Sequence, residues 1–346
     1  MKSRTGAGRA RDDPAMTTPA CRVPAASIDE LVAGAGRREP WRHEGKSGST
    51  LERLDLDGCP HVLKVVHPDD DWIARAVGDI CCFPVQVWTA GLLDEVPPVI
   101  DHTVVGAVAG LGRNGWGGAL LMRDVSPWLL PEGDTKVPRE VHLGFLDHMA
   151  ALHARFWGFR DGLLPLSARY LFFSDAMIEA ERRRGMPAPV PAVAAQGWGR
   201  FAAFRHPAVG PLLELRGDPS PLVAALDATP QTLVHGDWKM GNLGWHPDGR
   251  TILLDWAFPG SAPPTVDLAW YLALNVRRLP QSKDDAIVTY RAALERHGVD
   301  TTGWWQNQLE LALLGQVLIL GWEKALGDHA ELRWWLDRAA GGLARL

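Results

Sequence analysis

One stretch in the second half of the chain constrains the fold more than any other. It reads Leu233-Val-His-Gly-Asp-Trp-Lys-Met-Gly-Asn242, and the segment Thr251-Ile-Leu-Leu-Asp-Trp256 follows it. Each segment has a short apolar run followed by polar residues, and a His-Pro-Asp-Gly turn lies between them. This pattern predicts two strands joined by a tight turn, which would bring Asp237, Asn242 and Asp255 together at one rim.

The residue types at this rim suit a divalent cation and a phosphate. Mg²⁺ takes oxygen ligands and is usually bound by only one or two protein carboxylates. An Asp, an Asn five residues later and an Asp after a further strand form the arrangement by which protein kinases hold a base and two metal ligands. The alternative is a polar β-hairpin in which His235 and Asp237 only hydrogen-bond the backbone.

The motifs around this rim resemble a known family. His235-Gly236-Asp237 with Asn242, then Asp255-Trp256, then Pro264 and Asp267-Leu268-Ala269, look like the aminoglycoside phosphotransferase and choline kinase-like group of small-molecule kinases. The resemblance spans roughly residues 40 to 335, the usual length of one two-lobed kinase, and its C-terminal part is the more specific.

This resemblance implies an α+β, protein kinase-like fold with two lobes. We expect a disordered tail over residues 1–26 and a small, nucleotide-binding N-lobe with an antiparallel sheet over residues 27–125. A larger, mainly helical C-lobe over residues 126–346 would carry the catalytic and acceptor-binding groups.

The resemblance also implies a reaction, in which the γ-phosphoryl group of ATP moves to a hydroxyl of a small molecule. Asp237 would orient that hydroxyl and accept its proton in the transition state. Asn242 and Asp255 would hold Mg²⁺, and Lys239 would reach the γ-phosphate. Asp267 would anchor the catalytic loop.

Two features of the N-terminal part fit nucleotide binding. The turn Ser47-Gly48-Ser49 is expected to present backbone N–H groups to phosphates, although an ordinary hairpin turn explains it equally well. The run 61–66 predicts a strand in which Lys64 shares its face with two valines. We interpret Lys64 as the lysine that holds the α- and β-phosphates; the alternative is an edge-strand lysine.

Two further N-lobe expectations concern the partner of Lys64 and the hinge. Kinases pair this lysine with a Glu on the next helix, but here no Glu occurs between Lys64 and Glu95. Asp79 is the nearest suitable carboxylate, but a plain surface residue explains it equally well, so the partner stays open. The resemblance makes Met122, Arg123 and Asp124 the hinge between the lobes, where backbone groups would bond adenine.

The segment after Asp255 favours a small acceptor. Only eleven residues separate Asp255 from Asp267, three of them are prolines, and no Ala-Pro-Glu follows. Because each proline fixes φ and removes a donor, this segment is too short and stiff for a peptide platform. The acceptor itself is not identified, and aminoglycosides, amino sugars, sugars and amino alcohols all stay open.

Composition narrows the partners. The 346 residues are 46% hydrophobic and carry a formal net charge of −5 that is spread along the chain, so a basic nucleic-acid surface is not expected. The four cysteines form no disulfide or zinc pattern, and no stretch is long and apolar enough to span a bilayer, which together favour a cytoplasmic protein. The oligomeric state, monomer or dimer, stays open. Two other functions stay open: a kinase-like nucleotide-binding protein without turnover, and a metallohydrolase using His235, Asp237 and Asp255.

Overall fold

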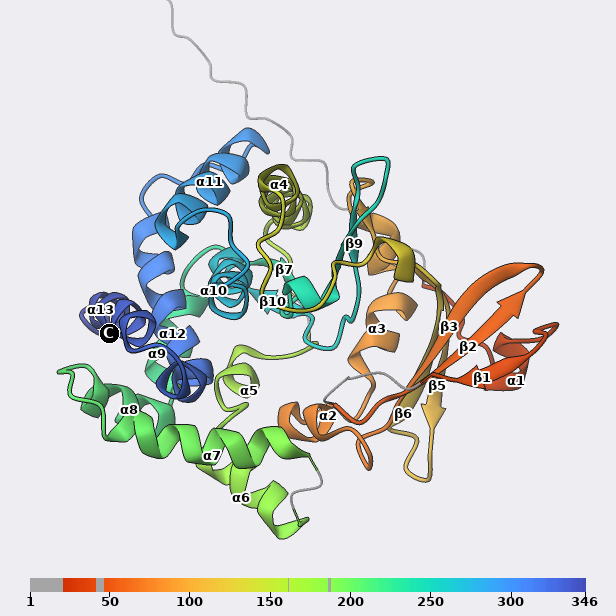
Figure 1. Ribbon diagram of the computed structural model, residues 1–346, viewed down its shortest axis with the longest axis horizontal. Coiled ribbons are helices and arrows are strands. Elements are labelled where there is room, and N and C mark those ends of the chain that lie inside the picture. Colours follow the sequence, from red (N-terminus) through yellow and green to blue (C-terminus); the bar gives the residue numbers. More distant parts are fainter. Residues whose placement is uncertain (1–20, 42–46, 161, 186–187) are drawn as a thin grey trace, which may run out of the picture.

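The computed structural model describes residues 21–41, 47–160, 162–185 and 188–346 (Figure 1). The first twenty residues of the expected tail, and Gly45 and Lys46 before the Ser-Gly-Ser turn, lie outside the described residues. Ordered contacts begin before the expected boundary at residue 26, because Arg22 N–H donates to Thr89 O and Ala25 N–H donates to Ala107 O.

A five-stranded antiparallel sheet forms the smaller part of the molecule. Its strands are β1 (Arg38–Pro40), β2 (Thr50–Leu56), β3 (Cys59–Val66), β5 (Val104–Leu111) and β6 (Gly117–Arg123), in the order β1-β2-β3-β6-β5. Successive side chains of a strand point to opposite faces. Leu63 accordingly packs into a small core beside helix α1 (Ile28–Leu31), whereas Val66 joins the main core; Lys64 shares the face of Val66.

Two short helices pack between this sheet and the rest of the molecule. Helix α2 (Trp72–Val77) begins at Asp71, whose side chain caps it, and ends at Gly78, whose φ of +70° needs a residue without Cβ. Helix α3 (Phe83–Thr89) packs against β5 and β6. A 3-10 turn, η1 (Leu92–Glu95), follows it.

The larger part is mainly helical and surrounds α12, whose side chains are buried on nearly every side. Trp305, Trp322 and Trp335 are buried here, so these aromatic side chains serve the core. Within the described residues, no helix is both long and apolar enough to cross a membrane. The helices are η2 (Ser126–Trp128), α4 (Arg139–Arg155), α5 (Leu166–Tyr170), α6 (Asp175–Arg183), α7 (Pro189–Ala202), α8 (Val209–Gly217), α9 (Ser220–Asp227), η3 (Met240–Asn242), α10 (Pro264–Leu274), α11 (Lys283–Arg296), α12 (Trp305–Leu326) and α13 (His329–Leu343).

Two small sheets position the polar rim, and they correct the expected hairpin. The strand before His235, β7 (Thr232–Val234), pairs with β10 (Gly260–Ala262) and not with the strand before Asp255. The tight turn instead joins β8 (Leu243–Trp245) to β9 (Thr251–Leu253). The sequence missed β8 because three residues, one of them glycine, give too short a pattern to recognise.

The same sheet links the two parts of the molecule. Strand β4 (Ile100–Asp101), which lies within the expected N-lobe, pairs in parallel with β9. The segment after η2 also joins it, since Leu129 bridges Gly244 and Leu130 N–H donates to Leu243 O. The strand that leads to Asp255, β9, therefore pairs with one strand from before the expected boundary at 125/126 and with one from after it.

Candidate active site

The carboxylate of Asp237 lies in the loop between β7 and β8 and is buried. Its Oδ2 accepts hydrogen bonds from Lys239 Nζ at 2.7 Å and from Asn242 Nδ2 at 2.8 Å, and its Oδ1 accepts one from Trp270 Nε1 at 2.8 Å. A carboxylate has about four lone-pair sites, so these three donors orient it and leave room for one more.

A second buried carboxylate, Asp267 in α10, holds the backbone of this loop. It accepts hydrogen bonds from His235 N–H at 2.9 Å, from Gly236 N–H at 2.7 Å and from His153 Nε2 at 3.1 Å. Burial alone would raise the pKa of Asp267, but the bond from His153 and the charge of Arg169 outweigh burial and lower that pKa. Asp267 therefore stays ionised, in the anchoring role that the resemblance implied.

The imidazole of His235 fastens the loop to the end of β9. Its Nε2–H donates to Leu254 O at 3.0 Å, and its Nδ1 accepts from Asp237 N–H at 3.2 Å. Burial lowers the pKa of His235, which matches a neutral ring with one donor and one acceptor nitrogen. Both nitrogens are in use, so the imidazole has no lone pair for a metal.

Gly236 is required where it stands. Its φ is +78°, and a Cβ there would lie 2.1 Å from Phe258 O and within 2.7 Å of the guanidinium of Arg169. That guanidinium is buried and donates to Gly236 O and Phe258 O. The loop before Asp237 thus has a fixed shape that only glycine fits.

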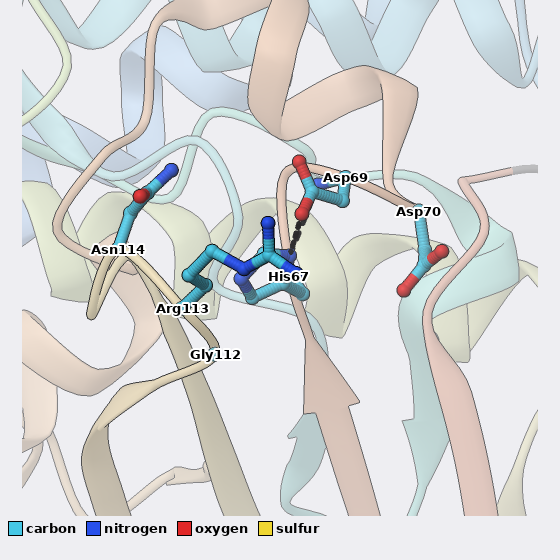
Figure 2. A pocket seen from close by; sticks show the side chains of 6 residues that line it. All are labelled: His67, Asp69, Asp70, Gly112, Arg113 and Asn114. Atoms are coloured by element: carbon cyan, nitrogen blue, oxygen red, sulfur yellow. Dashed lines mark hydrogen bonds and ion pairs between the residues drawn. The ribbon is translucent and has the colours of Figure 1, made fainter.

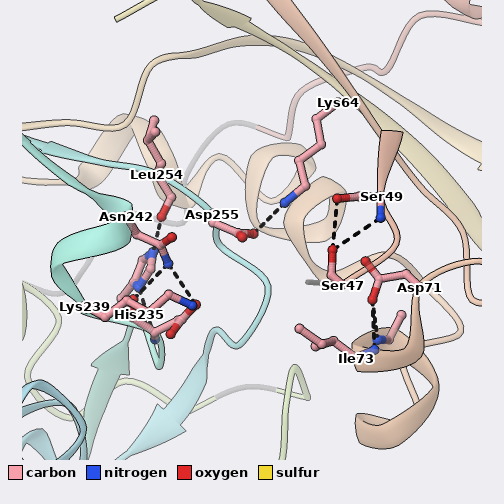
Figure 3. A network of polar contacts seen from close by, with 12 residues as sticks. Ser47, Ser49, Lys64, Asp71, Ile73, His235, Lys239, Asn242, Leu254 and Asp255 are labelled. Carbon is pink, nitrogen blue, oxygen red and sulfur yellow. Dashed lines mark hydrogen bonds and ion pairs between the residues drawn. The ribbon is translucent and has the colours of Figure 1, made fainter. Parts of the chain in front are cut away.

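Asp255 follows β9 directly and is the least enclosed acid of the site. Its side chain is 33% exposed, and Lys64 Nζ donates to its Oδ1 at 2.7 Å across the two parts of the molecule (Figure 3). Its φ of +63° is uncommon for a residue with a Cβ, and such strain often marks functional positions. Burial alone would raise the pKa of Asp255, but Lys64 and Lys239 outweigh burial and lower it.

The two lysines of the site are both held charged by carboxylates. Burial alone would lower the pKa of Lys64, but Asp255 and then Asp71 outweigh burial and raise it. Burial likewise would lower the pKa of Lys239, and Asp237 with Asp255 raises it. Lys239 and Asn242 both donate to Asp237, and Figure 3 shows Asp255 on the same side of the site as Lys239 and Asn242.

The Ser47-Gly48-Ser49 turn lies beside Lys64 and next to α2 (Figure 3). Ser47 O accepts from Trp72 N–H at 3.0 Å, and the Ser47 and Ser49 hydroxyls are 3.0 Å apart. A Cβ on Gly48 would lie 2.1 Å from Asp70 O. The structure thus brings the described part of the predicted phosphate turn to the predicted phosphate lysine.

The predicted hinge residues Met122, Arg123 and Asp124 lie at and just beyond the end of β6. Their N–H groups are partly in use, because Arg123 N–H donates to Thr103 O and Asp124 N–H donates to Pro60 O. The side chain of Arg123 pairs with Asp101. An adenine ring at this edge would therefore have to bond to backbone carbonyl groups, or to an N–H group after Asp124 in the chain.

The surface of the described residues includes two hollows of interest. One, of about 750 Å³, lies just beyond the C-terminal end of β3 and is lined by none of the predicted site residues (Figure 2). The other, of about 360 Å³, borders the catalytic loop itself. The first is lined by His67, Asp69, Asp70, Gly112, Arg113 and Asn114, and the second by Gly133, Asp134, Lys239, Met240, Gly241, Ala273, Leu274, Asn275, Val276, Arg277, Arg278 and Glu323.

Three residues of the site were missed from the sequence: His153, Arg169 and Trp270. A lone His or Arg on an apolar helix is most often a satisfied core or surface residue, so neither carries a signal. Trp270 had a usable signal, since it lies three residues after Asp267 on a helix and so on nearly the same face. Asp79 is not the partner of Lys64. Its carboxylate accepts from Cys81 N–H and from Phe83 N–H at the start of α3, and it makes no ion pair with Lys64 in the described structure.

Comparison with protein families decides the class of this site. The model of the phosphotransferase enzyme family APH matches residues 88–299, which is more than half of the chain. The chain belongs to this family. The predictions of family, of a kinase-like α+β fold and of a small-molecule phosphotransferase are thereby confirmed.

Solved structures of the same fold are distant in sequence. The choline kinase LicA from Streptococcus pneumoniae is 12% identical with a TM-score of 0.51, over 92% of this chain and 98% of LicA. The aminoglycoside phosphotransferase APH(3'')-Id from Streptomyces rimosus is 18% identical with a TM-score of 0.45, over 84% and 96%. At 12% identity, the match to LicA shows the fold alone. No curated protein sequence matches this chain.

Proposed function

We propose that this phosphotransferase uses ATP and Mg²⁺ and transfers the γ-phosphoryl group to a hydroxyl of a small molecule. The observation that carries the proposal is the fixed carboxylate of Asp237, which Lys239, Asn242 and Trp270 orient. Asp237 and Asp255 both act on Lys239, and Asp255 accepts a hydrogen bond from Lys64 of the smaller part of the molecule. Base, metal ligands and phosphate lysine have the arrangement that phosphoryl transfer uses.

The donor set fits Mg²⁺. Asn242 uses its Nδ2 toward Asp237, which leaves its amide oxygen as a ligand, and Asp255 is partly exposed. Among the described residues, no cluster of three or more Asp, Glu, His or Cys residues is arranged to hold a metal. Two oxygen side chains suit Mg²⁺, which completes its octahedron with phosphates and water. When bound, Mg²⁺ neutralises charge on the phosphates.

Each protein group then has a definite task. Asp237 keeps about one lone-pair site for the acceptor hydroxyl, aligns it and accepts its proton as the new O–P bond forms. Lys239, whose charge is held by Asp237 and Asp255, lies where it can contact the transferred phosphoryl group. Lys64 and the Ser47-Gly48-Ser49 turn bind the remaining phosphates.

We place the acceptor in the 360 Å³ hollow beside Lys239. Its wall is the C-terminal end of α10 with Glu323 of α12, and its mouth carries the Asp134–Arg277 ion pair at 2.9 Å. A hollow of this size suits a small molecule. Because acidic and basic side chains both line it, the charge of the lining does not choose between a cationic and a neutral acceptor.

The test has two stages. Nucleotide binding is measured with and without Mg²⁺, and ADP release is then measured with a panel of amino sugars, sugars, amino alcohols and aminoglycosides, against generic protein substrates. We expect Mg²⁺-dependent ATP binding and ADP release with at least one small acceptor. Robust phosphorylation of protein with none of any small acceptor contradicts the proposal.

A further inference from the structure

The one recorded ion-pair partner of Lys64 in the described structure is Asp255, which the proposed function assigns to the metal. A carboxylate that binds a divalent cation stabilises the charge of the neighbouring lysine less. The side chain of Lys64 is only 13% exposed, and a largely buried ammonium without a counter-charge is costly. The nucleotide phosphates would supply part of this counter-charge, and a second carboxylate near Lys64 would keep the ammonium directed at them.

Two buried carboxylates lie in this region, and they differ in what they already hold. Asp79 uses both oxygens, because Oδ1 accepts from Cys81 N–H at 3.0 Å and Oδ2 accepts from Phe83 N–H at 2.8 Å. Asp71 caps α2 with Oδ1 alone, which accepts from Ile73 N–H at 2.9 Å and Ala74 N–H at 3.2 Å. Among the described residues, Oδ2 of Asp71 keeps its acceptor capacity.

Asp71 also lies on the side from which nucleotide phosphates would approach Lys64. Leu51 stands opposite Lys64 in the β2–β3 pairing, so the turn just before Leu51 is beside the lysine. That turn is joined to α2 by the bond from Trp72 N–H to Ser47 O, and Figure 3 shows Asp71 next to Ser47. After Asp255, Asp71 is the carboxylate whose charge acts most on Lys64.

The position of Asp71 is fixed from the C-lobe side. Arg75, on the same short helix, makes a bidentate ion pair with the buried Glu181 of α6, at 2.8 and 2.9 Å. Trp72 stacks on Phe172 with ring centroids 5.4 Å apart. Bidentate pairs and stacked aromatics define an orientation as well as a contact. The helix that carries Asp71 is thereby clamped to the part that carries the catalytic loop.

We propose that Asp71 is the positioning residue for Lys64 and takes the place of the helix Glu that this chain lacks. The inference rests on the proposed function. In it, Asp71 supplies the permanent counter-charge that keeps the Lys64 ammonium directed at the phosphates when Asp255 binds the metal. Asp79 is a structural cap for the start of α3.

The experiment compares Asp71→Asn with Asp79→Asn as a matched control. Both changes remove one buried charge. Asp71→Asn can keep both capping hydrogen bonds, because both go to one oxygen, whereas Asp79→Asn keeps only one of its two. Binding of Mg·ATP and of adenosine is measured for each variant, together with melting temperature and the KM for ATP.

We expect Asp71→Asn to weaken Mg·ATP binding and raise the KM for ATP by about tenfold, the scale of one lost charge interaction. Adenosine affinity should stay the same, because adenosine has no phosphates. A merely structural role for Asp71 predicts equal losses for both ligands. Asp79→Asn should leave both affinities within about twofold of the wild type.

Unchanged Mg·ATP binding in Asp71→Asn, or a larger loss in Asp79→Asn, overturns the assignment while the proposed function stands. If the wild type itself does not bind Mg·ATP, the proposed function and this inference fail together. Should Asp71→Asn not fold, Asp71→Ser keeps an oxygen at the cap without the charge and serves in the same comparison.

Discussion

Asp267 and Asp255 lie twelve residues apart in sequence and are held very differently. Asp267 is fully buried and accepts three hydrogen bonds, two from the backbone of the catalytic loop and one from His153. Asp255 is one-third exposed, has a positive φ, and relies on one ion pair with a lysine from the other part of the molecule.

This difference separates an anchor from a ligand. Asp267 has three of its about four lone-pair sites occupied by fixed donors in the interior, so it defines the shape of a loop and has little left to offer a cation. A partly exposed carboxylate with one ion-pair partner could exchange that lysine for a metal ion, and the lysine could then pair with phosphates. The catalytic-loop side of the site is therefore preorganised, whereas the nucleotide side is arranged to change partners.

The largest expected effect tests the preorganised side. Asp237→Asn should lower phosphoryl transfer by about a hundredfold to ten-thousandfold, because the amide cannot accept the hydroxyl proton. ADP release with a confirmed acceptor gives the rate, and Mg·ATP binding checks that the site is intact. Asp248→Asn, an exposed change on the turn between β8 and β9, is the control that should behave like the wild type. A wild-type rate in Asp237→Asn would falsify the assignment.

The next effect tests the side that changes partners. Lys64→Met should lower kcat/KM for ATP by about ten- to a hundredfold. Stability should change little, because the change also removes the desolvation cost of a largely buried ammonium and leaves Asp255 one-third exposed. Lys283→Met removes the lysine of a similarly enclosed pair, Lys283–Glu331, which has no proposed role in the site. This variant should leave ATP kinetics unchanged. Equal ATP kinetics in the two variants would make Lys64 an ordinary strand residue.

A smaller effect measures how rigid the anchor is. Gly236→Ala should destabilise the fold by about 1–3 kcal/mol, because the methyl group adds strain at positive φ and meets Phe258 O. Gly249→Ala is matched, since its φ is +89° but a Cβ there has open space. Urea unfolding of both variants separates the two costs, and equal losses would show that the loop yields to the added methyl group.

The smallest effect is a pH dependence of stability. Burial first, and Arg139 second, lower the pKa of His142 from 6.5 to about 4. Below pH 6.5 this histidine binds a proton in the unfolded chain but stays neutral in the folded one. The free energy of unfolding therefore falls as pH drops from about 6.5 toward 4. His142→Asn should reduce the drop in unfolding free energy between pH 7.5 and 5.5 by about 1 kcal/mol. An unchanged drop would mean that His142 is protonated in the folded protein.

The same contrast explains what the sequence could predict. Asp237, Asn242 and Asp255 were found because their spacing along the chain reports their chemistry. The pairing of β7 with β10, and the roles of His153 and Arg169, depend on contacts between residues far apart in sequence, for which three-residue strands and single buried polar residues give no pattern. Asp79 was only the nearest suitable carboxylate in sequence, and the path of the chain between α2 and α3 turns its carboxylate to the backbone.

The parallel pairing of β4 with β9 has a consequence for modularity. Ile100 and Asp101 are hydrogen-bonded into the hairpin that ends at Asp255, and Asp101 also pairs with Arg123 at the end of β6 and with Arg250 of the hairpin. A chimera cut at the boundary near residue 125 would therefore exchange one of the three strands of this sheet and leave the other two with a foreign partner. Recombination between relatives would preserve function only where residues 100–101 and the β8–β9 hairpin are inherited together.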